Sequence, residues 1–428
     1  MSQNNIGRRS FLKGSSVAVG AGLLGGLAGC GGSGSSAASG SSSAASSDFK
    51  AGFIFLHDEN STYDKNFMDG AKAACDELGI ESVFKTNIDE SEACQQAAEE
   101  LADQGCGIVF ADSFGHEDYV IEAAKEFTDV QFCHSTGTKA HTEGLDNYHN
   151  AFASIYQGRY LAGIAAGMKL NEMIADGTIT EDKAHMGYVG AFTYAEVISG
   201  YTSFYLGAKS VCPSVTMDVT FTGSWYDQSA EQEAAARLID EYGCVLISQH
   251  ADSMGAPSAC EERNVPNVSY NGSTIEACPN TFIVSARIDW APYYKYAIQA
   301  AMKGDPIDTD WTGDLSTESV KLTDINADVA AEGTQEAIDE ATKALEDGSL
   351  HVFDTSTFTV TVDDKKNANA TVDGSGVLTG YMADVDTDEA FEGDTEAVSD
   401  GYFHESEYRS APYFDVQIDG INLLDTQF

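Results

Sequence analysis

AGFIFLH, at residues 51–57, is a short apolar run rich in β-forming residues, and a helical pattern from Asp64 to Leu78 follows it after a polar turn. A strand, turn and helix in this order form the repeating unit of an α/β fold. The same alternation recurs along most of the chain. Further strand-like runs are SVFKTN (82–87), CGIVFAD (106–112), VQFCHST (130–136), HMGYVGAF (185–192), TMDVTFTGSW (216–225), CVLISQH (244–250), PNVSYNG (266–272) and TFIVSARIDW (281–290). The sequence therefore predicts parallel sheets with helices on both faces.

The strand–helix series is interrupted at residues 150–172, NAFASIYQGRYLAGIAAGMKLNE, which have the pattern of a long helix with small residues on one face. We interpret this helix as a crossover between two lobes, because single hydrophobic cores stop growing at about 250–300 residues. Residues 49–152 are predicted to form the first lobe and residues 153–291 the second.

The chain is expected to return to the first lobe through a helix at Ala291–Lys303, and residues from about 292 to 352, with a helix at 328–347, would complete that lobe. From about residue 353 the periodicity is lost. The stretch DTSTFTVTVDD…TVDGSGVLTGYM is predicted to form a hairpin. We therefore expect residues 353–428 to be a C-terminal appendage packed on a two-lobed body.

The first thirty residues carry two export signals. Gly7–Lys13 (GRRSFLK) has the paired arginines of a twin-arginine (Tat) signal, and Leu27–Cys30 (LAGC) is a lipobox. The segment between them is too short and too weakly apolar to form a stable membrane span. Residues 1–29 are thus predicted to be a Tat lipoprotein signal peptide, followed by a Gly/Ser tether at 30–48 that starts at lipidated Cys30. We expect an extracytoplasmic protein that is held on the cell membrane by its lipid anchor.

The chain is strongly acidic, with 68 acidic and 23 basic residues and a formal net charge of −45. Because nucleic-acid phosphates would be repelled, nucleic acid is excluded as a main partner. Eight cysteines remain besides Cys30, without a CxxC motif or zinc-ligand spacing. Cys260 and Cys278 flank one predicted strand and could pair outside the cytoplasm, but the connectivity stays open at this point.

Ligands of open α/β sheets bind at the carboxyl ends of the strands. Nearly every predicted strand ends in an aromatic residue accompanied by a carboxylate or a hydroxyl, in the segments 57–67, 112–115, 134–137, 192–194, 223–227, 250–255 and 287–290. Aromatic side chains stack on nucleobases with about 1–3 kcal/mol per base. Carboxylates are strong acceptors for N–H and O–H groups. This pattern predicts an interlobe cleft suited to a flat heteroaromatic molecule that carries hydroxyls or amines.

Each of these residue types also has a structural interpretation. Four polar residues could cap the helices that follow them, namely Asp58, Asp112, Asp227 and Ser253. Three aromatic residues could belong to the core, namely Tyr63, Phe67 and Trp225. We interpret His57 and His250 as structural rather than as metal ligands.

A calcium loop beginning at Asp384 is rejected, because Glu389 and Thr395 stand where an EF-hand needs glycine and glutamate. No metal site and no cofactor are predicted.

Several separated segments resemble, in the same order, a known family: FIFLHDENSTYDKNFMDGAKAACDELGI (53–80), IYQGRYLAGIAAGM (155–168), FTGSWYDQSAEQEAAARLID (221–240), QHADS (249–253) and DWAPYYKYAIQAAMKGD (289–305). They look like the BMP (basic membrane protein) substrate-binding lipoproteins of ABC importers, over roughly residues 50–355. The resemblance implies a type I periplasmic-binding-protein fold, with two Rossmann-like lobes joined by three hinge crossovers. It also implies a purine nucleoside or nucleobase as the ligand. The acidity of this chain and its long tail past residue 353 depart from the family pattern.

By position, the resemblance places the ligand-binding residues at His57, Asp58, Asn60, Tyr63, Phe67, Asp112, Ser113, Phe114, Trp225, Asp252, Ser253, Asp289 and Trp290. It implies that a monomer captures its ligand by hinge closure and delivers it to a membrane permease. The ATPase must be a separate chain, since this sequence has no GxxxxGK[ST] motif.

No catalytic residues are predicted, because neither GxSxG in the folded region nor HExxH occurs. Two alternatives stay open. One is a lipoprotein that binds or senses a sugar or another small molecule. The other is a surface nucleoside hydrolase with a carboxylate cluster around calcium.

Overall fold

A computed structural model describes residues 48–363, 366–385 and 393–425. The predicted signal peptide, the lipidation site Cys30 and the tether up to residue 47 lie outside the described residues, as do Asp386, Asp388 and Glu389 of the rejected calcium loop. Among the described helices, none is both long and apolar enough to cross a membrane.

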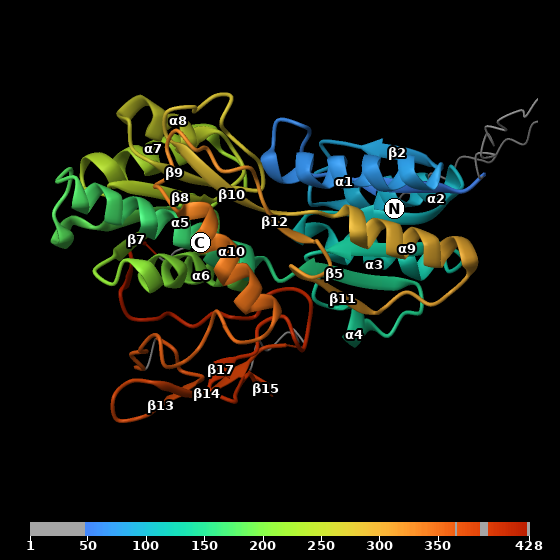
Figure 1. Cartoon of the computed structure of the whole chain (residues 1–428). Helices are drawn as coiled ribbons and strands as arrows, with labels where there is room; N and C mark the ends of the chain where they lie inside the picture. The colour runs from blue at the N-terminus through green and yellow to red at the C-terminus, as the bar shows by residue number, and fades with distance from the viewer. Residues whose placement is uncertain (1–47, 364–365, 386–392, 426–428) are drawn as a thin grey trace, which may run out of the picture. The chain divides into compact units, whose positions relative to one another are not determined.

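The first lobe is built on a six-stranded parallel sheet with the order β11-β5-β4-β3-β1-β2 (Figure 1). Its strands are β1 (Lys50–Ile54), β2 (Glu81–Lys85), β3 (Cys106–Ala111), β4 (Gln131–Ser135), β5 (Tyr148–Ala153) and β11 (Asp310–Gly313). Helices α1 (Thr62–Leu78) and α9 (Ala291–Lys303) pack on each other on one side. Helices α2 (Glu92–Asp103) and α3 (Glu117–Glu126) pack together over a second core cluster, and a short helix, α4 (Ala140–Glu143), precedes β5.

The second lobe is built on a seven-stranded sheet with the order β12-β10-β9-β8-β6-β7-β18, in which only β12 runs antiparallel to its neighbour. Its strands are β6 (His185–Gly190), β7 (Thr216–Phe221), β8 (Leu246–His250), β9 (Asn267–Tyr270), β10 (Phe282–Ile288), β12 (Val320–Leu322) and β18 (Ile421–Leu423). Helices α5 (Ile155–Ala175) and α6 (Ala195–Val211) pack closely on each other. Helices α7 (Gln228–Asp240) and α8 (Gly255–Arg263) form another pair, over a separate core cluster.

The predicted α/β fold with helix-flanked parallel sheets is therefore confirmed. One boundary is wrong: residues 150–153 belong to strand β5, and the helix begins only at Ile155. All six residues of β5 are buried, and both of its edges are paired, with β4 and with β11. The sequence NAFA has no strong preference of its own, so these tertiary pairings decide its conformation.

The allocation of residues 292–352 to the first lobe is also wrong beyond β11. Strand β12 pairs with β10 of the second sheet, and helix α10 (Thr334–Glu346) packs against α5. The chain thus passes between the sheets at 153–155, at 288–291 and at 313–320.

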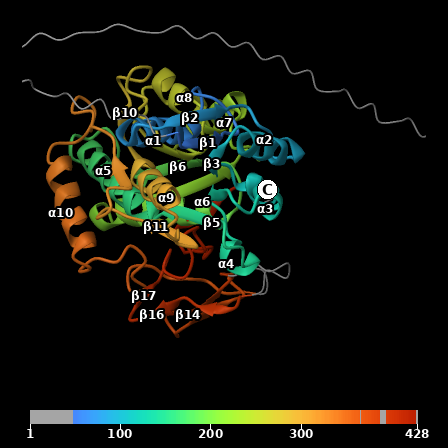
Figure 2. The same cartoon turned by 90° about the vertical axis from the view of Figure 1, so that its right-hand side faces the viewer.

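The C-terminal part contains short strands: β13 (Ala370–Val372), β14 (Leu378–Ala383), β15 (Thr395–Glu396), β16 (Val398–Ser399) and β17 (Tyr402–Phe403). The predicted hairpin exists only as β13–β14, because residues 354–363 form loop hydrogen bonds instead, such as those from the N–H of Thr355 to Gly401 and from the N–H of Val360 to Gly376. The end of the chain is not a separate appendage, since β18 extends the second sheet beside β7. In Figures 1 and 2 the red C-terminal part lies on the same side of the molecule as α4 and β11.

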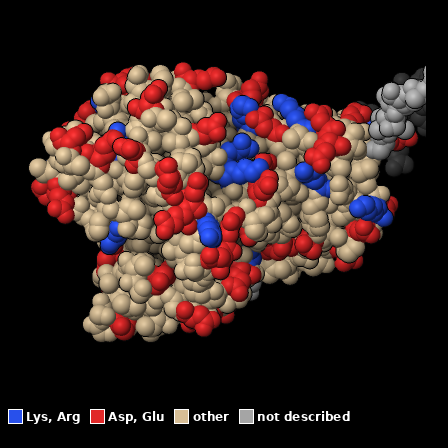
Figure 3. Space-filling model, in the orientation of Figure 1, with Lys and Arg blue, Asp and Glu red and all other residues tan. Residues whose placement is uncertain are grey.

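The eight cysteines in the described part of the chain are all buried and unpaired, so the structure does not form the pairing considered for Cys260 and Cys278. Acidic side chains are scattered over the whole face that Figure 3 displays. The negative charge is therefore a property of that entire face rather than of one element.

The contact between α5 and α6 depends on glycine. A Cβ atom at Gly207 would lie 2.0 Å from the carbonyl oxygen of Tyr160, and one at Gly163 would lie 2.1 Å from that of Phe204. The two helix backbones can therefore approach only because these positions lack a side chain.

We expect Gly207→Ala to lower the free energy of unfolding by about 1–3 kcal/mol, because the methyl group has to push two packed helices apart. Urea unfolding measures this change. Gly374→Ala is the control, since a Cβ at Gly374 meets nothing within 4 Å. An equal effect of both substitutions would contradict the packing argument.

Candidate functional site

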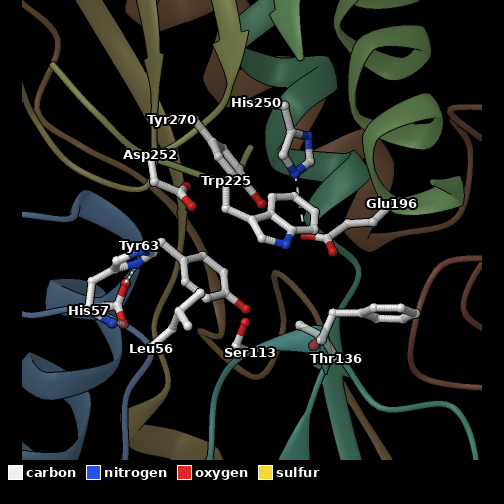
Figure 4. A pocket seen from close by; sticks show the side chains of 12 residues that line it. Leu56, His57, Tyr63, Ser113, Thr136, Glu196, Trp225, His250, Asp252 and Tyr270 are labelled. Atoms are coloured by element: carbon white, nitrogen blue, oxygen red, sulfur yellow. Dashed lines mark hydrogen bonds and ion pairs between the residues drawn. The ribbon is translucent and has the colours of Figure 1, made fainter. Parts of the chain in front are cut away.

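A pocket lies where the carboxyl ends of the strands of the two sheets face each other (Figure 4). The first lobe contributes Leu56, His57, Tyr63, Asp64, Ser113, Phe114 and Thr136, and the second contributes Glu196, Trp225, His250, Asp252 and Tyr270. We call this set of residues the primary pocket. Each residue follows or ends a strand, or lies in the first turns of the next helix, which is where ligands of α/β sheets bind.

Six residues predicted from the sequence line the primary pocket: His57, Tyr63, Ser113, Phe114, Trp225 and Asp252. Seven predicted residues do not line it: Asp58, Asn60, Phe67, Asp112, Ser253, Asp289 and Trp290. Their side chains have structural roles instead. Of the four residues that could cap helices, only Asp227 is the N-cap of its helix, where it accepts from the N–H groups of Ser229 and Ala230.

Among the seven predicted residues outside the primary pocket, the polar ones stabilise loops through local hydrogen bonds and an ion pair. Asp58 accepts hydrogen bonds from the backbone and the side chain of Asn60, and these bonds lower the pKa of Asp58. Ser253 Oγ accepts from the backbone N–H of Gly255. Asp289 accepts from the N–H of Ala291 and forms an ion pair with Lys321 at 2.9 Å.

The other members of this group are core residues or lie just behind the pocket wall. Phe67 stacks on Trp290 with ring centroids 4.3 Å apart, and both rings are buried. Asp112 is buried behind the pocket, where Oδ1 accepts from the N–H of Leu56. The backbone carbonyl of Asp112 accepts from Tyr63 OH at 2.7 Å, so this residue positions the tyrosine ring that lines the pocket.

Six pocket residues were missed by the sequence reasoning: Leu56, Asp64, Thr136, Glu196, His250 and Tyr270. Thr136 and His250 lie at strand ends that the sequence marked, so their positions were a usable signal. Tyr270 is the last residue of β9 and was counted within the strand. Glu196 lies in the first turn of α6, where an acidic residue is ordinary, so its role becomes visible only in three dimensions.

Carboxyl groups of both lobes lie near one another at the pocket, namely Asp64 and Asp112 of the first lobe and Asp252 of the second. Asp64 accepts from His57 N–H at 2.7 Å and from Ser61 Oγ at 2.6 Å, which places its carboxylate at the amino end of α1. Burial raises the pKa of Asp112 and of Asp252 well above the ordinary value, and the nearby charge of Asp64 raises both further. A ligand that donates hydrogen bonds here would offset this unfavourable accumulation of negative charge.

Aromatic faces from both lobes meet at the pocket. Phe114 of the first lobe lies 5.3 Å from Tyr194 of the second, measured between ring centroids, and Trp225 packs on Phe192 at 5.1 Å. In Figure 4 the Tyr63 side chain lies below the ring of Trp225.

Several polar atoms of the pocket lack a protein partner. Within the described residues, Tyr270 OH, Thr136 Oγ1 and His250 Nδ1 are buried without a hydrogen bond. His250 Nε2 lies 3.3 Å from Glu196 Oε1, and burial lowers the pKa of His250 despite this neighbour. Buried polar groups are rarely left unpaired unless a ligand or water completes them.

The two lobes touch across the pocket. The N–H and Oγ1 of Thr62 both donate to the carbonyl of Asp252, at 3.2 and 3.1 Å, and Asn66 Nδ2 donates to the carbonyl of Ile288. The volume open to the centre of a water molecule is about 20 Å³, roughly enough for one water. Entry of a heteroaromatic ring therefore requires the lobes to separate or the rings to move.

A group of three potential metal ligands, His185, Asp218 and Cys244, lies at the opposite, amino-terminal edge of the second sheet and takes no part in the pocket.

Two α/β lobes with a closed cleft at their strand ends are the architecture of two-lobed ligand-binding proteins that close around a small molecule. Residues 55–350 match the family described as ABC transporter substrate-binding protein PnrA-like, and the chain belongs to this family. Its members are substrate-binding proteins rather than enzymes, they act outside the cytoplasm, and they bind small molecules and work with a permease.

Relatives and solved structures agree with this assignment. The chain is 32% identical over 260 residues to a purine-binding protein of Brucella abortus, covering 60% of this chain and 69% of that one. It is 31% identical over 248 residues to a Haloferax volcanii protein provisionally named as an ABC transporter glucose-binding protein, covering 57% of this chain and 59% of that one.

Among solved structures, a solute-binding protein of an ABC transporter from Aeropyrum pernix superposes with a TM-score of 0.61 at 15% identity, covering 74% of this chain and 95% of that one. A counterpart from Conexibacter woesei gives a TM-score of 0.57 at 22% identity, covering 71% and 98%. These likenesses support the fold.

Glu231, on α7, holds the loop that carries Asp252, because its carboxylate accepts from the N–H of Ser253. Burial raises the pKa of Glu231 from 4.5 to about 7. Below pH 4.5 the carboxyl group is protonated in both the folded and the unfolded state. As the pH rises toward 7, the unfolded state loses the proton first, so folding loses up to about 3 kcal/mol across this window.

We expect Glu231→Gln to remove this loss, because an amide does not ionise. The free energy of unfolding of the variant, relative to the unmodified protein, should rise between pH 4.5 and 8 in urea titrations. Glu262→Gln, at an exposed position on α8, is the control. A difference that does not change with pH would show that folding leaves the pKa of Glu231 unshifted.

Proposed function

We propose that this protein captures a purine nucleoside or nucleobase in the primary pocket by hinge closure and delivers it to an ABC permease whose ATPase is a separate chain. The observation that carries the proposal is the combination of aromatic faces from both lobes with carboxylates and unpartnered hydroxyls in one closed cleft. Aromatic rings stack on the flat faces of a purine, and the polar atoms accept or donate hydrogen bonds at its edge. The purine-binding relative from Brucella abortus supports the same ligand class.

Hinge closure is supported by the three chain crossings at 153–155, 288–291 and 313–320. A few short segments of this kind can absorb the dihedral changes of a domain rotation. Opening would break the Thr62 and Asn66 hydrogen bonds across the cleft and widen the primary pocket.

Export and anchoring complete the proposal. Residues 7–13 and 27–30 support Tat export followed by lipidation of Cys30, which would tether a monomeric binding protein to the membrane. We expect Cys30→Ser to move the protein from the membrane fraction to the soluble fraction, as followed by cell fractionation and immunoblotting. Ser33→Ala, in the tether, is the control, and membrane retention of Cys30→Ser would contradict the lipid anchor.

A sugar ligand is the second candidate, and the provisional name of the Haloferax volcanii relative favours it. Calorimetric titration of the chain, stripped of carried ligand, against adenosine, guanosine, inosine, adenine and glucose separates the two candidates. Binding of a purine in the micromolar range or tighter is expected. Binding of glucose alone would overturn the purine proposal, and nucleoside turnover that needs calcium and stops in EDTA would indicate a hydrolase.

We expect Trp225→Ala and Asp252→Ala each to weaken purine binding at least tenfold while leaving the fold intact, because one removes a stacking face and the other a buried acceptor. Calorimetry gives the affinities, and circular dichroism checks the fold. Asp289→Asn is a matched control, since this carboxylate also follows a strand but lies outside the primary pocket. Unchanged affinity in both pocket variants would place the binding site elsewhere.

A further inference from the structure

The C-terminal segment from 404 to 425 is tied to both lobes. In the first lobe, the N–H of Ser410 donates to Asp310 Oδ1 on β11 at 2.9 Å. In the second lobe, Asp425 accepts from Thr220 Oγ1 at 2.7 Å and from the N–H of Phe221 at 3.1 Å, directly after β18 has paired with β7. The segment therefore bridges the lobes on one side of the cleft.

This segment and both lobes line a partly open cavity of about 450 Å³, a size within the range of small-molecule sites. We call it the second cavity. It shares Phe114, Thr136 and Glu196 with the primary pocket, so the two spaces adjoin through common walls. The C-terminal segment lines it with Arg409, Tyr413 and Asp415, among others. These residues lie beyond the part of the chain that matches the family, which ends at residue 350.

The charges of the second cavity favour hydroxyl donors over anions. Among the described residues, three carboxylates line it, from Glu196, Asp384 and Asp415, against one guanidinium, that of Arg409. The guanidinium is committed to the protein, because it donates to the carbonyls of Ala411, Val385 and Pro412 at 2.9–3.1 Å. A phosphate would thus meet an excess of negative charge without a mobile cation to pair with.

Two buried hydroxyl groups also indicate that the second cavity is a ligand site. Tyr201 and Thr136 line the second cavity and are 1% and 3% exposed, and within the described residues Tyr201 OH and Thr136 Oγ1 are buried without a hydrogen-bond partner. Burial raises the pKa of Tyr201, and the carboxylate of Asp415 contributes to this shift. The phenol is therefore protonated and able to donate a hydrogen bond near an acceptor carboxylate, which suits a ligand hydroxyl that accepts from one group and donates to the other.

We propose that the C-terminal segment turns the cleft into a site with two compartments, in which the second cavity takes an uncharged, hydroxyl-bearing substituent of the ring bound in the primary pocket. This inference rests on the proposed function and adds to it the class of the substituent and a set of binding residues outside the family region. The hydroxyls would be held by Tyr201, Thr136 and the carboxylates, and the aromatic walls would cover the C–H faces of a sugar or polyol.

Calorimetry with adenosine, adenine and adenosine monophosphate tests this proposal on the purified chain. Tyr201→Phe removes one unpartnered hydroxyl without changing the shape of the side chain, and we expect it to weaken adenosine binding three- to tenfold while leaving adenine unchanged. Tyr205→Phe is the matched control, because Tyr205 is buried one turn further along α6 and lines neither space. A second variant, Ala411→Phe, fills the second cavity and should weaken adenosine binding more than tenfold.

The outcomes separate this inference from the proposed function. Binding of adenosine and adenine that neither Tyr201→Phe nor Ala411→Phe alters would overturn the second compartment alone. Tighter binding of adenosine monophosphate than of adenosine would overturn the chemical class assigned to it. Failure of the unmodified protein to bind any of adenosine, guanosine, inosine and adenine would overturn the proposed function, and this inference would fall with it.

Discussion

A buried guanidinium that has no carboxylate partner among the described residues organises the second lobe. Arg159, on α5, is fully buried and donates to Tyr188 OH and Ser248 Oγ at 2.9 Å and to the carbonyl of Ser269 at 3.3 Å. Its charge also lies 5.2–5.3 Å from the ring centroids of Tyr188, Phe204 and Tyr270. Cation–π contacts of desolvated groups are worth about 2 kcal/mol, and together with three hydrogen bonds they offset the cost of burying the charge. One side chain thus ties β6, β8 and β9 together beneath the cleft.

Tyr270 connects the buried guanidinium of Arg159 with the primary pocket. Its ring rests on the guanidinium, while its hydroxyl lines the primary pocket without a partner in the described part of the chain. The ring also contacts His250 at 4.3 Å between centroids, and His250 is held by Glu196. The second-lobe wall of the pocket is therefore set by the core before any ligand arrives, and this preorganisation lowers the entropic cost of binding.

In the first lobe, a carboxylate rather than a guanidinium holds the pocket wall in place. Glu117 accepts from the N–H groups of Thr138 and Lys139 and from Tyr148 OH, all within 2.8–2.9 Å. These bonds hold the loop after β4, in which Thr136 has a φ of 74°, an unusual value for a β-branched residue. The loop is further confined because a Cβ at Gly137 would lie 2.0 Å from Asn150 Nδ2. Backbone strain of this kind persists only where the surroundings enforce it. Here the strained loop places Thr136 in the walls of both the primary pocket and the second cavity.

The sequence predicted the alternation of strands and helices and the strand ends that form the cleft, because both follow from local periodicity and from a general rule of parallel sheets. It could not distinguish a strand-end carboxylate that lines the pocket, such as Asp252, from one that pairs with its own surroundings, such as Asp289, since both have the same local pattern. It also missed β5, whose conformation depends on pairing with β11, some 160 residues later in the chain. The roles of Arg159 and Glu117 likewise depend on contacts distant in sequence.

The position of the C-terminal segment also depends on contacts that are distant in sequence. Without β18, strand β7 would be an edge strand with unpaired backbone groups, which proteins generally protect. Pairing with β18 satisfies that edge, and Asp425 then fixes the end of the strand to Thr220 and Phe221. An edge-protecting strand anchored at this place must be reached by chain that runs from the first lobe past the cleft, where Ser410 contacts Asp310. The residues between these two anchors are thereby brought beside the ligand pocket, so that stabilising the sheet edge and lining the second cavity are consequences of one path of the chain.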